Sequence, residues 1–447
     1  MKKTVINSTV ALSLALSACS LAPTYQRPSM TIPAGWSDVS GVGATEQNST
    51  PFWQDLGSDE LNRLIDNVLA QNLDLEAALH RIEQARAQAK VAAAPLYPTI
   101  NASGTAAHTF QDPTDKSAAG GGANISYEVD LWGKNRNQAQ SADYRIDASQ
   151  FDREALRLVV TADATNFYSQ ILSLNDRAQI AEFNLKNAED ILRIVEARFN
   201  AGGVSGLEVS QQRVAVNNFR TALTSLIEQR STTANALAIL LGLAPQDLAT
   251  PTASLVSLKL PAVNLTPPST LLTARPDIES AEAGLRAANA DIGAARAAFF
   301  PSLTLSASTV IAAGFGGPAA AASSIASSLL APIFTGGQLT GNLENVTARQ
   351  KEFAANYQKT VLTAFQEVED ALAGLKGANE RAVIARSSVT ESQNAYNIAK
   401  AQFDAGAIDY LNLLDTQRSL YLAQDSEIAI AQAQLQSFVQ LRKAMGA

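Results

Sequence analysis

The chain has 447 residues, only 17% of them charged, with a formal net charge of −8, two histidines (His80 and His108) and one cysteine (Cys19). This length has room for about two or three domains, and the slight excess of acid provides no basic surface for nucleic acid. With so few histidines and cysteines there is little from which to build a transition-metal site and no internal disulfide, so we expect no cofactor, no metal and no nucleic-acid partner.

The N-terminus has the pattern of a secretory signal. Lys2 and Lys3 precede a short apolar stretch over 10–16, which is too short to span a bilayer. The sequence Leu16-Ser17-Ala18-Cys19 resembles the bacterial lipobox, in which the cysteine becomes the acylated first residue. The alternative is a plain secretory signal with an incidental cysteine, but Cys19 has no other evident use. We predict a signal peptide over 1–18 and lipidation of Cys19, and the resemblance places the anchor in the outer membrane because Ser20 follows rather than Asp.

An internal duplication organises the rest of the chain. The stretch EARFNAGGVSGLEVSQQR at 196–213 is echoed by KAQFDAGAIDYLNLLDTQR at 400–418. Upstream, Pro98 and Pro301 are 203 residues apart and open similar segments. After a lipidated N-terminal segment over 19–59, we therefore predict one repeat over 60–242, a Pro-rich connector over 243–269 and a second repeat over 270–447.

Each repeat contains a long heptad pattern. Apolar residues alternate at spacings of four and three from Val160 to Phe199, and the pattern recurs 204 residues later from Ala364 to Phe403, where only Ser392 breaks it. Such a pattern is typical of helices that supercoil on partners. No proline lies between 137 and 199, so that helix could run for about 90 Å.

The heptads end in two similar turns. Gly202 and Gly406 stand where a left-handed residue closes a helix, with Gly203 beside the first. Ser205, with Glu208, forms a capping box for the next helix, and Asp409 holds the equivalent position in the second repeat. We predict two helical hairpins that reverse at these turns.

In other parts of the chain, the spacing of apolar residues changes from a seven-residue repeat to strict alternation with a period of two. Four segments of about ten residues have the length of tilted membrane strands, namely 99–110, 123–132, 302–313 and 323–334. In the second, Ile125, Tyr127 and Val129 are expected to face lipid, while Glu128 and Asp130 face a barrel lumen. A small soluble sheet with one wet face is the alternative. We favour the membrane because no charged residue occurs over 297–343.

Aromatic residues and strand number complete the fold prediction. Aromatic side chains collect at the helix-proximal ends of the strands, as in an interfacial girdle: Tyr97, Trp132, Phe299, Phe300 and Phe334. Four strands close no barrel, whereas three copies would supply about twelve, an even number. The predicted fold class is an internally duplicated α+β membrane protein, with four transmembrane strands per protomer in a trimeric β-barrel and long coiled-coil helices in an α-barrel.

The whole mature chain resembles the TolC-like outer-membrane efflux proteins, in the lipoprotein branch that serves drug-efflux pumps. The resemblance is carried by motifs in a specific order: Cys19-Ser20-Leu21-Ala22-Pro23, Tyr25-Gln26-Arg27-Pro28, Phe52-Trp53, Tyr127 to Gly133, Arg275-Pro276-Asp277-Ile278, Phe300-Pro301-Ser302 and the turn from Gly406 to Arg418. It implies a homotrimer in outer-membrane lipid whose helical barrel crosses the periplasm. Through a periplasmic adaptor (membrane fusion) protein it docks to an inner-membrane transporter, of the resistance-nodulation-division or ABC type, and carries toxic small molecules out.

The resemblance also implies roles for particular residues. At the periplasmic aperture, Leu411 forms an apolar constriction, Asp415 an acidic ring, and Arg418 helps to lock neighbouring helices. We expect the adaptor to dock at the hairpin turns, which contain Gly202, Gly203, Ser205, Gly406 and Asp409.

Three other functions compete with efflux. An outlet for protein or peptide secretion of type I would share the channel architecture. A structural periplasmic coiled-coil lipoprotein would explain Cys19 and the heptads, but not the charge-free alternating strands. An enzyme is disfavoured, because the sequence offers no acid–base or nucleophile constellation.

Overall fold

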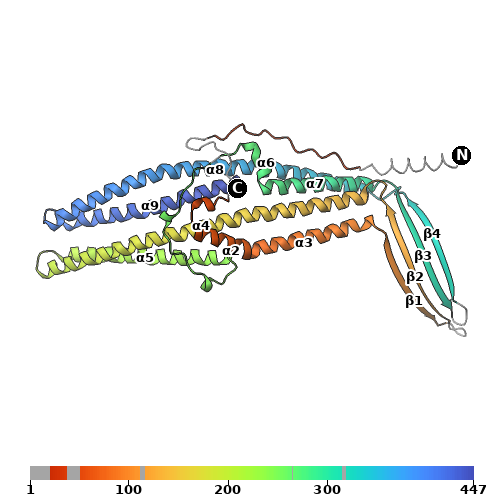
Figure 1. Cartoon of the computed structure of the whole chain (residues 1–447), viewed down its shortest axis with the longest axis horizontal. Helices are drawn as coiled ribbons and strands as arrows, with labels where there is room; N and C mark the ends of the chain where they lie inside the picture. Colours follow the sequence, from red (N-terminus) through yellow and green to blue (C-terminus); the bar gives the residue numbers. More distant parts are fainter. Residues whose placement is uncertain (1–20, 38–50, 111–115, 264, 315–318, 447) are drawn as a thin grey trace. The chain divides into compact units, whose positions relative to one another are not determined.

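A computed structural model of the chain describes residues 21–37, 51–110, 116–263, 265–314 and 319–446. Figure 1 labels the helices and strands. In chain order they are η1 (Gln54–Leu56), α2 (Asp59–Gln71), α3 (Leu73–Ala93), η2 (Ala94–Leu96), β1 (Thr99–Thr109), β2 (Lys116–Val129), α4 (Lys134–Asn200), α5 (Gly206–Leu240), η3 (Pro245–Asp247), η4 (Leu255–Ser257), η5 (Pro268–Thr270), α6 (Leu271–Ala274), α7 (Pro276–Ala297), β3 (Ser302–Gly314), β4 (Ala320–Leu330), α8 (Gln338–Asp404) and α9 (Tyr410–Ala444).

The elements repeat in length and in detail. Helices α4 and α8 have 67 residues each, and α5 and α9 have 35 each. The side chain of Asn72 donates to the Leu240 carbonyl at 2.9 Å, and Arg275 donates to the Ala444 carbonyl at the same distance. A glycine with a positive φ follows each of α5 and α9, with 68° at Gly242 and 79° at Gly446. A Cβ at either position would lie within 2.6 Å of a backbone carbonyl oxygen.

Most of the heptad residues are buried against neighbouring helices, as the sequence predicts, but Phe199 at the end of the first pattern is 46% exposed. Those with at most 8% of their surface exposed are Val160, Ala164, Ile171, Leu174, Ala178, Ala181, Ala188 and Val195 in α4, and Ala364, Val368, Ala371, Leu375, Ala378, Ala382, Ala385, Ala399 and Phe403 in α8. The many alanines leave room for close helix packing. Among the described residues, no helix combines the length and the apolar character needed to cross a membrane.

The chain folds into two compact units, and both contain parts of each sequence repeat. One comprises Ala78–Asp152 and Asp277–Thr360 with the described part of Met1–Met30, and it holds the whole sheet. The other comprises Thr31–Ala77, Arg153–Pro276 and Val361–Ala447, and it holds both hairpin turns. The repeats are therefore intertwined rather than folded one after the other.

The sheet is antiparallel throughout, in the order β1-β2-β3-β4, so β1 and β4 are its edges. Residues in register share a face because side chains alternate along a strand. One row contains Ile100, Ile125, Ala307 and Ile325, and the adjacent row on the opposite face contains Asn101, Asn124, Ser308 and Ser324. One face is thus largely apolar and the other largely polar.

Two strand boundaries differ from the sequence prediction. Strand β2 begins at Lys116 rather than at 123, because the glycines at 120–122 pair with both neighbours instead of forming a loop. Strand β4 spans Ala320–Leu330 rather than 323–334, and Pro332, which lacks an N–H, lies just beyond it. Asp130 also lies outside the sheet, since β2 ends at Val129.

Candidate functional site

The first hairpin turn closes as a helix end followed by a helix start. Gly202 has φ +74°, and the Gly203 N–H donates to the Arg198 carbonyl at 2.8 Å. Ser205 caps α5 in a reciprocal box with Glu208, and its hydroxyl accepts from the Leu207 N–H at 3.2 Å. The hydrogen bonds from Ser205 lower the pKa of the Glu208 carboxyl.

The second turn has the same construction with a different cap. Gly406 has φ +73°, and the Ala407 N–H donates to the Gln402 carbonyl at 2.8 Å. The Asp409 carboxylate caps α9 by accepting from the Asn412 N–H at 3.1 Å. Both turns therefore have the predicted geometry, and their role in adaptor docking stays a prediction.

The two hairpin ends share one apolar core. It contains Val195, Val209, Ala399, Phe403, Tyr410 and Leu413, drawn from all four long helices. The Arg198 guanidinium lies 4.7 Å from the centre of the Phe403 ring, in a cation–π contact. The turns are therefore packed together within one compact unit.

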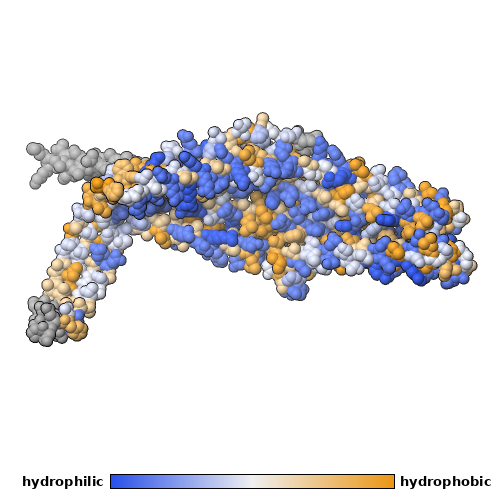
Figure 2. All heavy atoms as spheres, turned by 180° about the vertical axis from the view of Figure 1, so that it is seen from behind, coloured by the Kyte–Doolittle hydropathy of each residue, from blue (hydrophilic) through white to orange (hydrophobic). Residues whose placement is uncertain are grey.

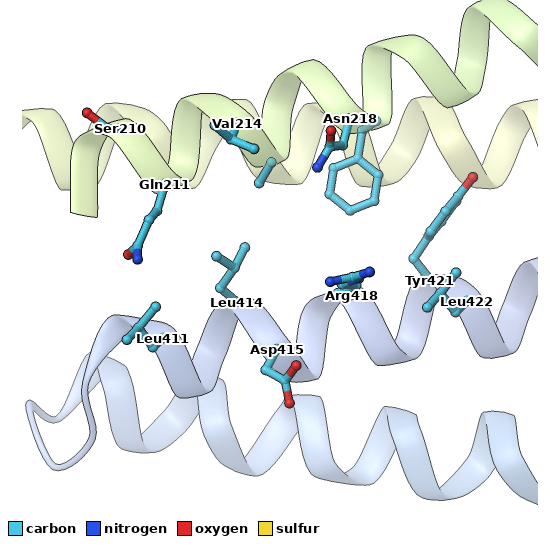
Figure 3. A pocket seen from close by; sticks show the side chains of 12 residues that line it. Ser210, Gln211, Val214, Asn218, Leu411, Leu414, Asp415, Arg418, Tyr421 and Leu422 are labelled. Carbon is cyan, nitrogen blue, oxygen red and sulfur yellow. The ribbon is translucent and has the colours of Figure 1, made fainter. Parts of the chain in front are cut away.

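A groove of about 810 Å³ lies between α5 and α9, next to these turns (Figure 3). Its lining residues are Ser210, Gln211, Val214, Ala215, Asn218, Phe219, Leu411, Leu414, Asp415, Arg418, Tyr421 and Leu422. The predicted aperture residues are therefore brought together in one place. Figure 3 shows Leu414 and Arg418 on α9 facing Val214 and Asn218 on α5.

The groove walls are equivalent positions of the two repeats. Four pairs lie 204 residues apart in the chain, on opposite walls: Ser210 and Leu414, Gln211 and Asp415, Val214 and Arg418, and Asn218 and Leu422. The α5 wall carries no charge at these positions, whereas the α9 wall carries one acid and one base. Duplication followed by divergence has thus placed the charges on one side only.

Leu411, Asp415 and Arg418 are all exposed, and half of the Leu411 surface is open to solvent. Among the described residues, no ion pair or side-chain hydrogen bond is formed by the Asp415 carboxylate or the Arg418 guanidinium. The spacing of three residues would allow an Asp415–Arg418 pair on the helix surface, but it does not form. Both charges are therefore available to groups outside this chain.

At the sheet, acids and aromatic residues mark the junction with the helices. Glu128, on the polar face, pairs with Lys134 at 3.2 Å. Asp130, predicted to face a lumen, instead accepts from the backbone N–H of Asn135 and of Arg136 at the start of α4, because it follows the last paired residue of β2.

The Trp132 indole donates to the Pro301 carbonyl at 2.8 Å, and Phe300 lies 4.8 Å from its ring. Figure 2 shows hydrophobic residues gathered where the sheet meets the helices.

Comparisons with known proteins identify the family. Residues 64–243 and 268–447 match the model of the outer membrane efflux protein family. The chain belongs to this family. It is 36% identical to the pyoverdine export outer membrane protein OpmQ of Pseudomonas aeruginosa, over 98% of this chain and 96% of that protein. It is 31% identical to the cation efflux system protein CusC of Escherichia coli, over 97% of each chain.

A solved structure has the same fold. The crystal structure of the Campylobacter jejuni CmeC outer membrane channel matches with a TM-score of 0.86 and 27% identity, covering 96% of this chain and 95% of that one. As an outer membrane efflux protein, the chain is the outer-membrane component of a tripartite efflux system and extends into the periplasm. The family works with adaptors and inner-membrane pumps and consists of channels rather than enzymes. The predictions of family, function and location are confirmed.

Two features of this efflux protein were not predicted from its sequence. Arg177 of α4 forms a two-pronged ion pair with Asp425 of α9, at 2.7 and 3.0 Å, which joins the two hairpins. Glu282 of α7 is buried with two arginines around it.

Two predictions concern absences or residues outside the described chain. Cys19 lies outside the described residues, so its lipidation stays a prediction. In the part of the chain that the structure describes, no three His, Cys, Asp or Glu side chains are grouped in a way that could hold a metal ion.

Proposed function

We propose that three copies of this chain form one efflux channel, with a twelve-stranded β-barrel in the outer membrane and an α-barrel in the periplasm. The observation that carries this proposal is the four-stranded sheet with two edge strands and two unlike faces. Open edges are not tolerated in hydrocarbon, because each unpaired backbone group costs several kcal/mol there. Joining β4 of one copy to β1 of the next removes every edge, and the polar face then lines the lumen.

The groove between α5 and α9, next to the hairpin turns, is proposed to form part of the periplasmic aperture. Three copies would place three Leu411 side chains and three Asp415 carboxylates around one axis, and the uncharged α5 wall adds no further acids. Arg418 has no ion pair or side-chain hydrogen bond with the described residues of its own chain, so it could bind a neighbouring copy. A ring of carboxylates focuses the field and favours cations, while the leucines restrict the width.

The hairpin turns are proposed to receive the periplasmic adaptor, which connects the channel to an inner-membrane transporter of the resistance-nodulation-division or ABC type. The glycines of both turns are exposed, and hydrogen-bonded caps at Ser205 and Asp409 start the next helices, which suits a docking surface. The names of the relatives cover pyoverdine export and cation efflux, so we propose toxic small molecules as cargo and assign their choice to the pump.

The test is an efflux assay in intact cells with the native adaptor and pump. Ala201→Arg together with Ala405→Arg places two bulky charges at the exposed turns. Efflux should fall severalfold while the amount of assembled trimer in the outer membrane is unchanged. Val256→Arg, at a residue of the connector that is 90% exposed, is the matched control and should retain efflux. Equal efflux by the wild type, the double variant and the Val256→Arg control would contradict docking of the adaptor at the turns.

Lipidation of Cys19 is proposed as the second attachment to the membrane. An acyl anchor with two or more chains binds stably, whereas one chain binds only marginally. Mass spectrometry of the mature N-terminus tests it, since an unmodified chain beginning elsewhere would contradict the proposal.

A further inference from the structure

The two helical hairpins of one chain are joined along one face of α4. Arg177 of α4 binds Asp425 of α9 at 2.7 and 3.0 Å, and the Arg198 guanidinium lies over the Phe403 ring of α8. Three residues between Arg177 and Arg198 are buried or half-buried, namely Ile180, Asn184 and Ile191. Spacings of three, four and seven residues keep all five on one side of the helix. The five α4 residues from Arg177 to Arg198 in this set are here called the α4 stripe.

The equivalent face of α8 is uncovered in the single chain. The residues 204 positions further on, here called the α8 stripe, are all exposed: Arg381, Ile384, Ser388, Ala395 and Gln402. Ile384 has 65% of its surface open to solvent. Among the described residues, the Arg381 guanidinium forms no ion pair and no side-chain hydrogen bond. The second repeat therefore carries a copy of the α4 stripe that no described residue of the chain covers.

The surface that receives the α4 stripe also has an uncovered copy. Within the chain the α4 stripe meets Phe403 and Asp425, and the positions 204 residues earlier are Phe199 and Thr221. Phe403 is 6% exposed, whereas Phe199 is 46% exposed. The side chain of Asp425 is 22% exposed, whereas Thr221 belongs to the exposed residues of α5. The first hairpin therefore carries an uncovered copy of the face that binds α4 in the second hairpin.

We propose that the α8 stripe of one copy packs against the first hairpin of the next copy, at Phe199 and Thr221, in the register in which the α4 stripe packs against the second hairpin. This inference rests on the proposed trimer. A closed ring of copies with two hairpins each alternates joins within a chain and joins between chains. Because the long helices of the two repeats have equal lengths, equivalent faces can make both joins. Pairing the α8 stripe with the first hairpin around the ring leaves neither face exposed.

The join between copies differs in its charges from the join within a chain. At the place of the Arg177 ion pair, Arg381 meets Thr221, whose hydroxyl already donates to a carbonyl of its own helix at 2.9 Å. Gln402 takes the place of Arg198 against the aromatic ring, so the cation–π contact is absent as well. A two-pronged arginine–carboxylate pair is stronger than a hydrogen bond to a neutral group. The seams between copies are therefore weaker at these points than the seam within each chain.

The register is tested by chemical cross-linking of the full-length protein in its native membrane, with a short bifunctional thiol reagent that spans an Arg–Asp pair. Arg177→Cys with Asp425→Cys calibrates the reagent, because these residues are in contact, and should cross-link within one chain. Arg381→Cys with Thr221→Cys should cross-link between chains with a comparable yield. Arg381→Cys with Glu228→Cys is the control, since position 228 lies about 10 Å further along α5.

The outcomes separate the contact from the trimer. A yield for Arg381→Cys with Thr221→Cys no higher than that of the control, or cross-links within one chain, overturns the proposed register. Native electrophoresis of the same membranes reports assembly independently. A trimer that lacks the cross-link overturns the contact alone, whereas protein that never forms a trimer overturns the proposed function together with it.

The missing carboxylate is the basis of a second test. Thr221→Asp puts an acid at the position that Asp425 holds in the other repeat, so it should pair with Arg381 of the neighbouring copy. The trimer should then dissociate at a temperature several degrees higher than the wild type, as measured by denaturing electrophoresis of samples heated in steps. Thr232→Asp is the matched control, since it adds the same charge at an exposed position about 16 Å further along α5.

Changing the arginine shows whether the engineered pair is direct. Arg381→Gln added to Thr221→Asp should abolish the gain in stability, whereas Thr221→Arg with Arg381→Asp should retain it, because the two charges are only exchanged. A gain that survives Arg381→Gln, or an equal gain with Thr232→Asp, would mean that the acid acts elsewhere and overturns the contact. Absence of any gain from Thr221→Asp in a correctly assembled trimer overturns it as well.

Discussion

At the scale of single residues, Asp415 and Glu282 are carboxylates in opposite surroundings. Asp415 is exposed on α9 and pairs with none of the described residues, whereas Glu282 is 5% exposed with two arginines and a tyrosine around it. The first can interact with ions and with neighbouring copies, and the second holds one segment of the chain to another. Each acid therefore has its own expected outcome on removal.

We expect Leu411→Ala with Asp415→Ala to widen the aperture and weaken cation selectivity. An acidic ring raises the local cation concentration on the order of tenfold, and the leucines limit the size of the solutes that pass. Single-channel conductance in planar bilayers should rise, the preference for cations should fall, and cells should become sensitive to bulky drugs without any pump. Gln211→Ala, on the uncharged wall, should retain selectivity, and unchanged conductance in a correctly assembled double variant would place the gate elsewhere.

Glu282 of α7 binds Tyr25 and Arg27 of the N-terminal segment Leu21–Arg27, and this contact should have a defined dependence on pH. Its pKa is lowered from the ordinary 4.5, so its contribution to stability is fully present above pH 4.5 and is lost as pH falls through the folded-state value. The groups that face it, Tyr25, Arg27, Arg286 and Tyr357, stay protonated over this range. The difference in Tm between wild type and Glu282→Gln should therefore be constant above about pH 5 and shrink below about pH 4. A difference that grows on acidification would contradict the ion pair.

At the scale of elements, the sheet register predicts opposite outcomes at adjacent residues of β2. Ile125 belongs to the apolar row and Asn124 to the polar row. An arginine on the lipid face near mid-bilayer costs about 2–4 kcal/mol, whereas a lumen position tolerates charge. Ile125→Arg should thus reduce the assembled trimer strongly and Asn124→Arg only slightly, as measured by native electrophoresis of outer membranes. Equal losses would refute the assignment of faces.

Helices were predicted well from the sequence and strand ends less well. The seven-residue period and the Gly turns at 202 and 406 locate helices of 67 and 35 residues, because both signals are local. The three glycines at 120–122 are typical of a loop, so the sequence does not predict the start of β2; their pairing uses β1 nearby and β3 far along the chain. The same applies to Arg27 and Glu282, which are 255 residues apart.

At the scale of the whole molecule, the two repeats provide the two walls of the groove, but only the second repeat places charged residues there. Equivalent positions of the two repeats face each other across the groove, and only the α9 wall carries an acid, Asp415, and a base, Arg418. The sequence of the second repeat alone predicts the aperture residues Leu411, Asp415 and Arg418. That the first repeat forms the opposite wall is seen only in the folded structure. The proposed assembly of three copies is the next level of this organisation.

The last prediction concerns how copies join. If β4 of one protomer pairs with β1 of the next, only residues on the same face can approach closely, because side chains alternate between faces. Ala102 lies on the apolar face with Ser323, Ile325 and Ser327, while Ser324 and Ala326 lie on the polar face. A cysteine at 102 combined with one at 323, 325 or 327 should give interchain disulfides for at least one partner, and none with 324 or 326. A disulfide requires Cβ atoms about 3.5–4.5 Å apart, which opposite faces exclude.

The size of the cross-linked products then decides the stoichiometry. Each protomer carries one β1 edge and one β4 edge, so complete cross-linking closes a ring. On non-reducing denaturing gels the products should end at trimer, with dimer as the only intermediate, and the parent chain with Cys19 alone should remain monomeric. A ladder extending beyond trimer would mean an open or larger assembly. Cross-links that ignore the faces would mean that β1 and β4 do not pair, and the barrel would then have to close in another way.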